Sequence, residues 1–243
     1  MRLALPFACL LVCGAGAYAK PVKIQHDSPA LEFTYEWPAQ AAAIPMLDRR
    51  FKAEADREYR RHLKLGREDK QLYEQQQRGS VSDFYSKKWS TAGESSRLLS
   101  LQYQHGTYTG GAHPNTDYGA LLWDKKLERQ VKFDDLFLHV RAFETLTRDR
   151  YCSALAAERR KRRGKDWQPG LAEFNQCPKY SYLAIAPVDR SHDGRFDTVA
   201  FVASPYTAGP YSEGEYEIDL PVTRQLITAM KPVYRGSFEP QRQ

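Results

Sequence analysis

His113 is the side chain in this sequence that is best suited to acid–base chemistry. A general base needs an oriented imidazole with a nucleophile or a water molecule within reach. The sequence contains no nucleophile elbow and no H-E-x-x-H pair that would supply such a partner or hold a metal. We therefore predict no catalytic residue, and we interpret His113 as a side chain that hydrogen-bonds within its own loop and fixes the loop's shape.

A row of alternating carboxylates lies near the C-terminus, at Glu213, Glu215, Glu217 and Asp219. Residues two apart share one face of a strand, and two carboxylates that flank a sugar can hydrolyse a glycosidic bond. Such a row is more often the solvated face of an edge strand, where charge also discourages aggregation. We therefore expect a contact surface for a basic protein here, and not a catalytic acid pair.

Residues 189–197 resemble the start of a calcium-binding loop. Oxygen-bearing side chains alternate from Asp189, and the sixth residue is Gly194. A calcium loop of this type also needs a bidentate Glu at its twelfth position, which Ala200 occupies in this chain. Because Asp and Gly are ordinary hairpin residues, we predict a turn without a metal, and we predict no other cofactor.

The glycines and the proline around His113 predict a rigid loop between two strands. Gly110 and Gly111 can adopt backbone angles that other residues reach only at a cost. Pro114 fixes its own φ and moves the residue before it towards an extended conformation. The sequence therefore predicts a loop with a defined shape.

The N-terminal half of the chain predicts strands and one long helix. Residues 31–37 alternate apolar and polar side chains, as a half-buried strand does. Residues 44–78 have a helical pattern that Gly66 could interrupt. The apolar stripe of this helix consists of Leu47, Phe51, Ala55, Tyr59 and Leu63. Further strands are predicted over residues 86–95, 97–107, 115–123 and 129–132.

A second long helix is predicted to begin at Asp134, whose side chain is suited to an N-cap, and to end before Gly164. Its predicted apolar positions are Phe137, Val140, Phe143 and Leu146. Three antiparallel strands follow over residues 181–188, 196–203 and 215–220, then a short helix over residues 221–230 and an extended tail. The fold class is α+β, an antiparallel sheet packed by two main helices. We expect one domain over residues 20–243, with a soft internal boundary near residues 80–131.

Residues 1–19 have the pattern of a secretory signal peptide, with Arg2, an apolar run and a small-x-small cleavage site. A helix that crosses a bilayer needs about 20 apolar residues, and this run is shorter, so no transmembrane segment is expected. Lipid attachment at Cys13 is not expected either, because Val12 stands where a lipoprotein signal has a small residue. The pattern predicts an exported, periplasmic protein.

The charge is moderately basic, with 36 Lys and Arg against 30 Asp and Glu, or +6. Removal of Arg2 with the signal leaves 35 against 30, or +5. Both signs are spread along the chain, which is not the dense basic patch of a nucleic-acid-binding protein. A local basic run at residues 159–165 is either a grip on an anionic polymer or a solvated helix end, where cations favour the helix dipole.

Two cysteines, Cys152 and Cys177, remain after the signal is removed. An even pair in an oxidising compartment predicts a disulfide. The spacing is not that of a C-x-x-C redox motif, so we expect a structural bond that contributes roughly 3 kcal/mol by restricting the unfolded chain.

Three motifs, in the same order along the chain, resemble a family of extracytoplasmic domains. They are the segments Tyr108-Thr109-Gly110-Gly111-Ala112-His113-Pro114-Asn115, Val131-Lys132-Phe133-Asp134-Asp135-Leu136-Phe137 and Ser204-Pro205-Tyr206-Thr207-Ala208-Gly209-Pro210-Tyr211, the last followed by Tyr216-Glu217-Ile218-Asp219-Leu220-Pro221. The family includes the ectodomains of RsiV-type, lysozyme-sensing anti-sigma factors. It also includes a non-catalytic module of some peptidoglycan deacetylases. This chain lacks a sigma-binding segment and a deacetylase block.

The resemblance implies an exported, non-catalytic binding protein of the cell envelope that recognises a lysozyme-like hydrolase, as an inhibitor or immunity protein. The alternatives are a peptidoglycan-binding module and an unrecognised cell-wall hydrolase. Tyrosines in the Gly- and Pro-rich segments are suited to contact surfaces, although core packing remains an alternative for at least one of them. The expected binding residues are Tyr108, Gly110, Gly111, His113, Asn115, Tyr206, Tyr211, Glu213, Glu215 and Glu217.

Overall fold

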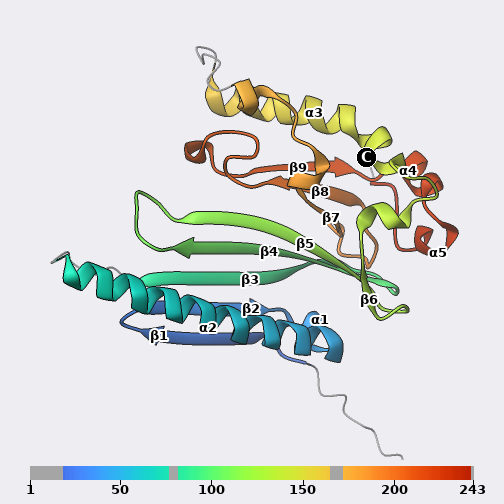
Figure 1. Ribbon diagram of the computed structural model, residues 1–243. Helices are drawn as coiled ribbons and strands as arrows, with labels where there is room; N and C mark the ends of the chain where they lie inside the picture. The colour runs from blue at the N-terminus through green and yellow to red at the C-terminus, as the bar shows by residue number, and fades with distance from the viewer. Residues whose placement is uncertain (1–18, 77–81, 165–171, 242–243) are drawn as a thin grey trace, which may run out of the picture.

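The computed structural model describes residues 19–76, 82–164 and 172–241. Two β-sheets lie face to face between two long helices (Figure 1). The predicted signal peptide falls outside the described residues, except for its last residue. No helix in the described part of the chain combines the length and apolar character that a bilayer crossing requires.

The first sheet has six strands in sequence order: β1 (Val22–Ser28), β2 (Leu31–Trp37), β3 (Asp83–Glu94), β4 (Leu98–Tyr108), β5 (Asn115–Asp124) and β6 (Arg129–Val131). Neighbouring strands are antiparallel except β2 and β3, which are parallel. The expected antiparallel sheet is therefore mostly antiparallel, with one parallel pair. Helices α1 (Ala39–Ala42) and α2 (Pro45–Gln75) connect β2 to β3, and a long helical crossover is the connection that parallel pairing requires.

Helix α2 covers one face of this sheet, as its apolar stripe predicts. Leu47, Phe51 and Ala55 are fully buried against the sheet, and Tyr59 and Leu63 are partly buried beside them. Gly66 does not interrupt the helix. It is buried where α2 passes the β1–β2 turn, and a Cβ there would lie 2.2 Å from the carbonyl oxygen of Ala30.

The second sheet consists of β7 (Ala184–Val188), β8 (Thr198–Ala203) and β9 (Tyr216–Pro221), all antiparallel. Helix α3 (Ala142–Arg163) covers its outer face (Figure 1). The rings of Phe143 and Tyr151 stack on Phe201, with centroids 5.7 and 4.9 Å away. The α+β class is thus confirmed, with two sheets where one was expected.

The second helix begins later than predicted. Asp134 lies in a 3-10 turn (Phe133–Leu136), while α3 begins at Ala142 after Arg141, whose φ is 65°. Val140, assigned to the apolar face, is 95% exposed. The chain after Lys231 is not extended, because α5 (Pro232–Arg235) follows α4 (Arg224–Ala229). Thr223 caps α4 by accepting a hydrogen bond from the amide of Leu226.

Cys152 and Cys177 form the predicted disulfide, with an S–S distance of 2.04 Å. The bond ties α3 to the segment that leads into β7. Arg148 reinforces it, because its guanidinium donates to the carbonyl oxygens of Cys177 and Pro178 at 3.0 Å each. This segment includes two further 3-10 turns, Ala172–Asn175 and Tyr180–Tyr182.

At one end of the first sheet, apolar side chains join the core of the second sheet. Leu98 and Leu122 extend from the first sheet into the core of the second sheet. Further along the same face the residues become polar, with Gln102 and Gln104 on β4 and Tyr118 on β5. The loops β4–β5 and β8–β9 lie towards this polar end (Figure 1).

Candidate functional site

The β4–β5 loop and the β8–β9 segment meet through three rings. The imidazole of His113 stacks on Tyr211 with a centroid distance of 3.6 Å and an interplanar angle of 12°. The hydroxyl of Tyr206 lies 3.2 Å from Nε2 of His113. The ring centroids of Tyr206 and Tyr211 are 5.7 Å apart. The structure thus brings together the two segments that the sequence assigns to one surface, and we call these three residues the His–Tyr cluster.

His113 also bonds within its own loop, as predicted. Its Nδ1 lies 2.9 Å from the carbonyl oxygen of Pro114. A carbonyl oxygen can only accept a hydrogen bond, so Nδ1 must carry the proton. In the neutral imidazole Nε2 is then the acceptor for the Tyr206 hydroxyl. The sequence interpretation of His113 was therefore incomplete, because the ring joins two loops as well as shaping one.

The two glycines of the loop differ in what they require. Gly110 has φ +90°, and a Cβ there would lie 2.5 Å from the hydroxyl of Tyr73. Gly111 has φ +107° with open space around it, so only its backbone angle favours glycine. Tyr108 donates a hydrogen bond to the carbonyl oxygen of Gly111 at 2.9 Å, which closes the loop. Asn115 is exposed at the start of β5.

Tyr206 is the most exposed ring of the cluster, at 55% of its surface. Its φ is +69°, a left-handed conformation that is costly for a bulky side chain. The neighbouring Ser204 fixes the segment to β5, because its hydroxyl donates to Asp117 at 2.8 Å and accepts from the amide of Tyr118 at 3.1 Å. The strained tyrosine is therefore held in place by its surroundings.

Three arginines of α3 hold the β8–β9 segment from the other side. Arg159 is buried and donates to the carbonyl oxygens of Ala208, Asn175 and Gln176 at 2.9, 3.3 and 3.0 Å. Arg162 donates to the carbonyl oxygens of Glu213 and Glu215 at 2.8 and 2.6 Å.

Arg163 forms a bidentate ion pair with Glu213, in which its Nε and Nη2 donate to the two carboxylate oxygens at 2.8 and 2.9 Å. Its side chain is only 4% exposed. Burial alone would raise the pKa of Glu213, but hydrogen bonds from Arg163 and Tyr216 outweigh it and hold the pKa below its usual value. This pair fixes the end of the segment that carries Tyr206 and Tyr211.

These contacts correct two sequence interpretations. The basic run is not simply a solvated helix end, since Arg159, Arg162 and Arg163 bind the chain itself, while Arg160 and Lys161 stay exposed. Glu213 does not share a face with the other carboxylates, because it lies in a 3-10 turn (Tyr211–Glu213) and its side chain turns inward. Lys165, at the end of the run, lies outside the described residues.

A signal for the buried arginines is present in the sequence. The buried residues of α3 recur every four positions, at Phe143, Thr147, Tyr151, Leu155 and Arg159, and the next step is Arg163. The apolar stripe of the helix thus continues directly into the basic run. Steps of four residues keep side chains on one helix face, so this continuation indicates burial.

The remaining carboxylates of the row are partly neutralised. Arg190 pairs with Glu217 at 3.0 Å and with Asp219 at 2.7 Å. Glu215 is exposed beside Tyr118, and burial together with this carboxylate raises the pKa of Tyr118 to about 12. The row is therefore less acidic towards solvent than the sequence suggests.

The segment that resembles a calcium loop is organised by hydrogen bonds of its own. The carboxylate of Asp189 accepts from the amides of Asp193 and Gly194 and from the hydroxyl of Ser191. Across the described residues, no group of three or more His, Cys, Asp or Glu side chains could hold a metal ion.

Part of the sequence matches a known family. Residues 24–116, from β1 into the start of β5, match the family model described as deacetylase PdaC. A comparison with curated proteins gives no match.

The whole fold matches solved structures. A DUF3298 family protein from Pseudomonas aeruginosa PAO1 has a TM-score of 0.56 at 13% identity, with 92% of this chain and 98% of that chain covered. A DUF3298 family member from Bacteroides fragilis NCTC 9343 has a TM-score of 0.53 at 18% identity, with 90% and 96% covered. At such identities the likeness shows a shared fold. It agrees at a coarse level with the resemblance to extracytoplasmic modules, and neither match names an anti-sigma factor.

Proposed function

We propose that this chain is a non-catalytic binding protein of the cell envelope that recognises a lysozyme-like cell-wall hydrolase, as an inhibitor or immunity protein. The observation that supports it best is the meeting of the two loops at the His–Tyr cluster. The proposed contact surface consists of this cluster with Tyr108, Asn115 and Glu215. It combines rigid aromatic side chains with a backbone that is already ordered, and both properties reduce the entropy lost on binding.

Charge decides how such a partner would approach. The mature chain is predicted to carry +5, which repels a basic hydrolase at long range. Glu213, Glu217 and Asp219 each have an arginine partner, and among the described residues only Glu215 of this row has no ion pair. We therefore expect aromatic contacts to supply most of the affinity, with Glu215 as the main attractive charge.

The test is isothermal titration of the purified chain with a basic muramidase of the lysozyme type. Replacing Tyr206 by Ala should weaken binding about thirtyfold, since buried interface tyrosines are frequent hot spots. Replacing Glu215 by Lys should weaken binding about fivefold at low salt and reduce its salt dependence.

Tyr182→Ala is the control, because Tyr182 is 66% exposed, comparable with Tyr206 at 55%, and lines a groove that no residue of the cluster lines. This variant should bind the muramidase as the parent does. Equal losses for Tyr182→Ala and Tyr206→Ala would show that the cluster is not the contact surface. Saturable sedimentation with peptidoglycan, without muramidase binding, would favour the wall-binding alternative.

A further inference from the structure

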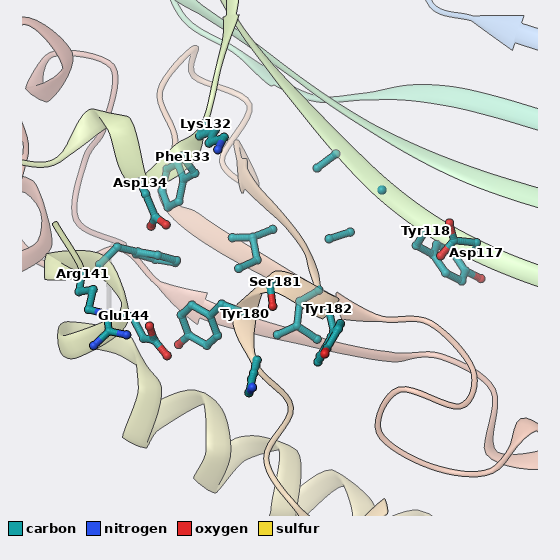
Figure 2. Close-up of a pocket in the computed structure, with 17 residues that line it drawn as sticks. Asp117, Tyr118, Lys132, Phe133, Asp134, Arg141, Glu144, Tyr180, Ser181 and Tyr182 are labelled. Atoms are coloured by element: carbon teal, nitrogen blue, oxygen red, sulfur yellow. The ribbon is translucent and has the colours of Figure 1, made fainter. Parts of the chain in front are cut away.

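A groove of about 930 Å³ lies beside β5, and none of the residues of the His–Tyr cluster lines it. Its walls are the outer edge of β5, the 3-10 turn at Phe133–Leu136, the start of α3 and residues 179–185. Figure 2 shows Arg141 and Glu144 at one end, Asp117 and Tyr118 at the other, and Tyr180 and Tyr182 between them. The volume is in the range of small-ligand sites.

Two tyrosines give the groove an aromatic floor. Tyr180 is fixed by a hydrogen bond to Thr147 at 2.9 Å and by edge contact with the ring of Tyr151, 5.8 Å away. Tyr182 is 66% exposed and has its ring open to solvent. An exposed aromatic face beside polar groups suits a ligand with an apolar face and polar rim, which is the character of a pyranose ring.

Charges of both signs surround this floor. Three cations line the groove, Lys132, Arg141 and Lys179, and none of them forms an ion pair within the part of the chain that the structure describes. The carboxylates are Asp117, Asp134 and Glu144, and Glu144 pairs with Arg148 at 3.5 Å. Burial and the neighbouring Glu144 raise the pKa of Asp134. The lining of the groove therefore carries three cations and three carboxylates, which leaves no net charge.

This balance selects between ligand classes. A polyanion would meet three carboxylates in the groove and would be repelled by them. A sugar with a single carboxylate offers hydroxyl donors to Asp134 and Asp117 and an acceptor to the cations. Arg141 has a left-handed backbone conformation, φ 65°, which is costly for a residue other than glycine. It precedes α3, and its long cationic side chain lines the groove.

From these features we infer that the groove binds a sugar that carries one carboxylate, with its ring against Tyr182 and its carboxylate beside Arg141 and Lys179. This site is separate from the proposed hydrolase contact and does not depend on it.

The test is a titration of the isotope-labelled protein, followed by amide chemical shifts, with N-acetylmuramic acid and with N-acetylglucosamine. These probes differ by the lactyl ether at O3, which carries the carboxylate, so the cation variants are needed to isolate the effect of the charge. We expect shifts at residues 141 and 179–183, and an affinity for the acidic sugar about threefold to fivefold higher, as expected for one partly solvated charge pair.

Variants separate the contributions. Arg141→Gln with Lys179→Gln should abolish the preference for the acidic sugar, and Tyr182→Ala should weaken both probes. Arg160→Gln, at an exposed cation outside the groove, should leave both affinities unchanged. Equal affinities of the parent for the two probes, shifts confined to other surfaces, or no shifts at all would each overturn the inference. Muramidase binding that persists in those cases would leave the proposed function standing.

Discussion

At the residue scale, the β4–β5 loop depends on glycines for two different reasons. Gly110 has a positive φ and lies against the hydroxyl of Tyr73, while Gly111 has only the positive φ. The sequence could predict that this loop is shaped, because Gly-Gly followed by His-Pro limits the backbone. It could not predict which glycine touches Tyr73, because that contact comes from a distant helix.

Replacing Gly110 by Ala should therefore lower the free energy of unfolding by about 1 kcal/mol or more, because the positive φ is costly for Ala and the hydroxyl of Tyr73 must also move. Gly111→Ala should cost about 1 kcal/mol. Urea unfolding measures both. Gly236→Ala is the control, since that position has negative φ and open space, and its stability should stay within about 0.5 kcal/mol of the parent. Parent-like stability of the Gly110 variant would contradict the shaped-loop account.

Asp83 gives a second prediction at this scale. It is buried at the start of β3, and burial together with the charge of Asp69 raises its pKa from 3.8 to about 6. A carboxyl with a higher pKa in the folded chain binds its proton more tightly there than in the unfolded chain. Its contribution to stability is therefore present below about pH 4 and is lost as the pH rises through about 6.

Asp83→Asn should remove this loss, because the amide stays uncharged. The variant should melt about 2–4 °C above the parent at pH 7.5, and the difference should disappear towards pH 4. Differential scanning calorimetry across this pH range measures the effect. A difference that is constant with pH would show that ionisation of Asp83 is not its cause.

At the scale of elements, α3 links three features: the disulfide, the apolar core of the second sheet and the proposed contact surface. Its regular steps of four residues place Tyr151 and Leu155 in the core and carry Arg159 and Arg163 to the β8–β9 segment. The helix acts as a support for the loop that carries Tyr206 and Tyr211.

Arg163→Gln should destabilise the protein by about 3 kcal/mol, because it leaves the buried carboxylate of Glu213 without its cation. The double variant with Glu213→Gln should recover part of this loss. Arg160→Gln, on the exposed side of the same helix, should change stability by less than about 0.5 kcal/mol. Guanidinium unfolding compares the three, and equal stability of the Arg160 and Arg163 variants would exclude a supporting role for the ion pair.

The disulfide supports the same helix from its middle. Replacing Cys152 and Cys177 by Ser should lower stability by roughly 3 kcal/mol, because the closed loop restricts the unfolded chain. The 25-residue separation of the two cysteines sets the size of that loop. Mass spectrometry of the non-reduced protein should find the two cysteines linked. Two free thiols in protein recovered from an oxidising compartment would rule out the bond.

The sequence predicts the strands better than it predicts how they pair. Alternation in β2 and the turn residues between β8 and β9 are local signals, and both regions form as expected. The parallel pairing of β2 with β3 and the second sheet's separate core depend on tertiary packing, which no local pattern encodes. For the same reason, the sequence does not predict that α3 begins as late as Ala142 or that its arginines bind the chain itself. The four-residue spacing of the buried positions is nevertheless a signal for the burial of Arg159.

At the scale of the whole molecule, two sheets in apolar contact at one end bring two loops together at the other. The fold creates one aromatic surface from segments about ninety residues apart, since Tyr206 and His113 are separated by 93 positions. Neither loop alone places the three rings of the His–Tyr cluster. A functional surface that depends on the packing of two sheets should be lost when that packing is lost.

The most direct test of the central claim is the rate at which a lysozyme-type muramidase clears a peptidoglycan suspension, measured with and without this protein. We predict that the parent protein slows clearing in a saturable way, that Tyr206→Ala does so much less, and that the protein alone clears nothing. Clearing by the protein alone would identify a hydrolase. A muramidase rate that the parent leaves unchanged would contradict the account of this chain as an inhibitor.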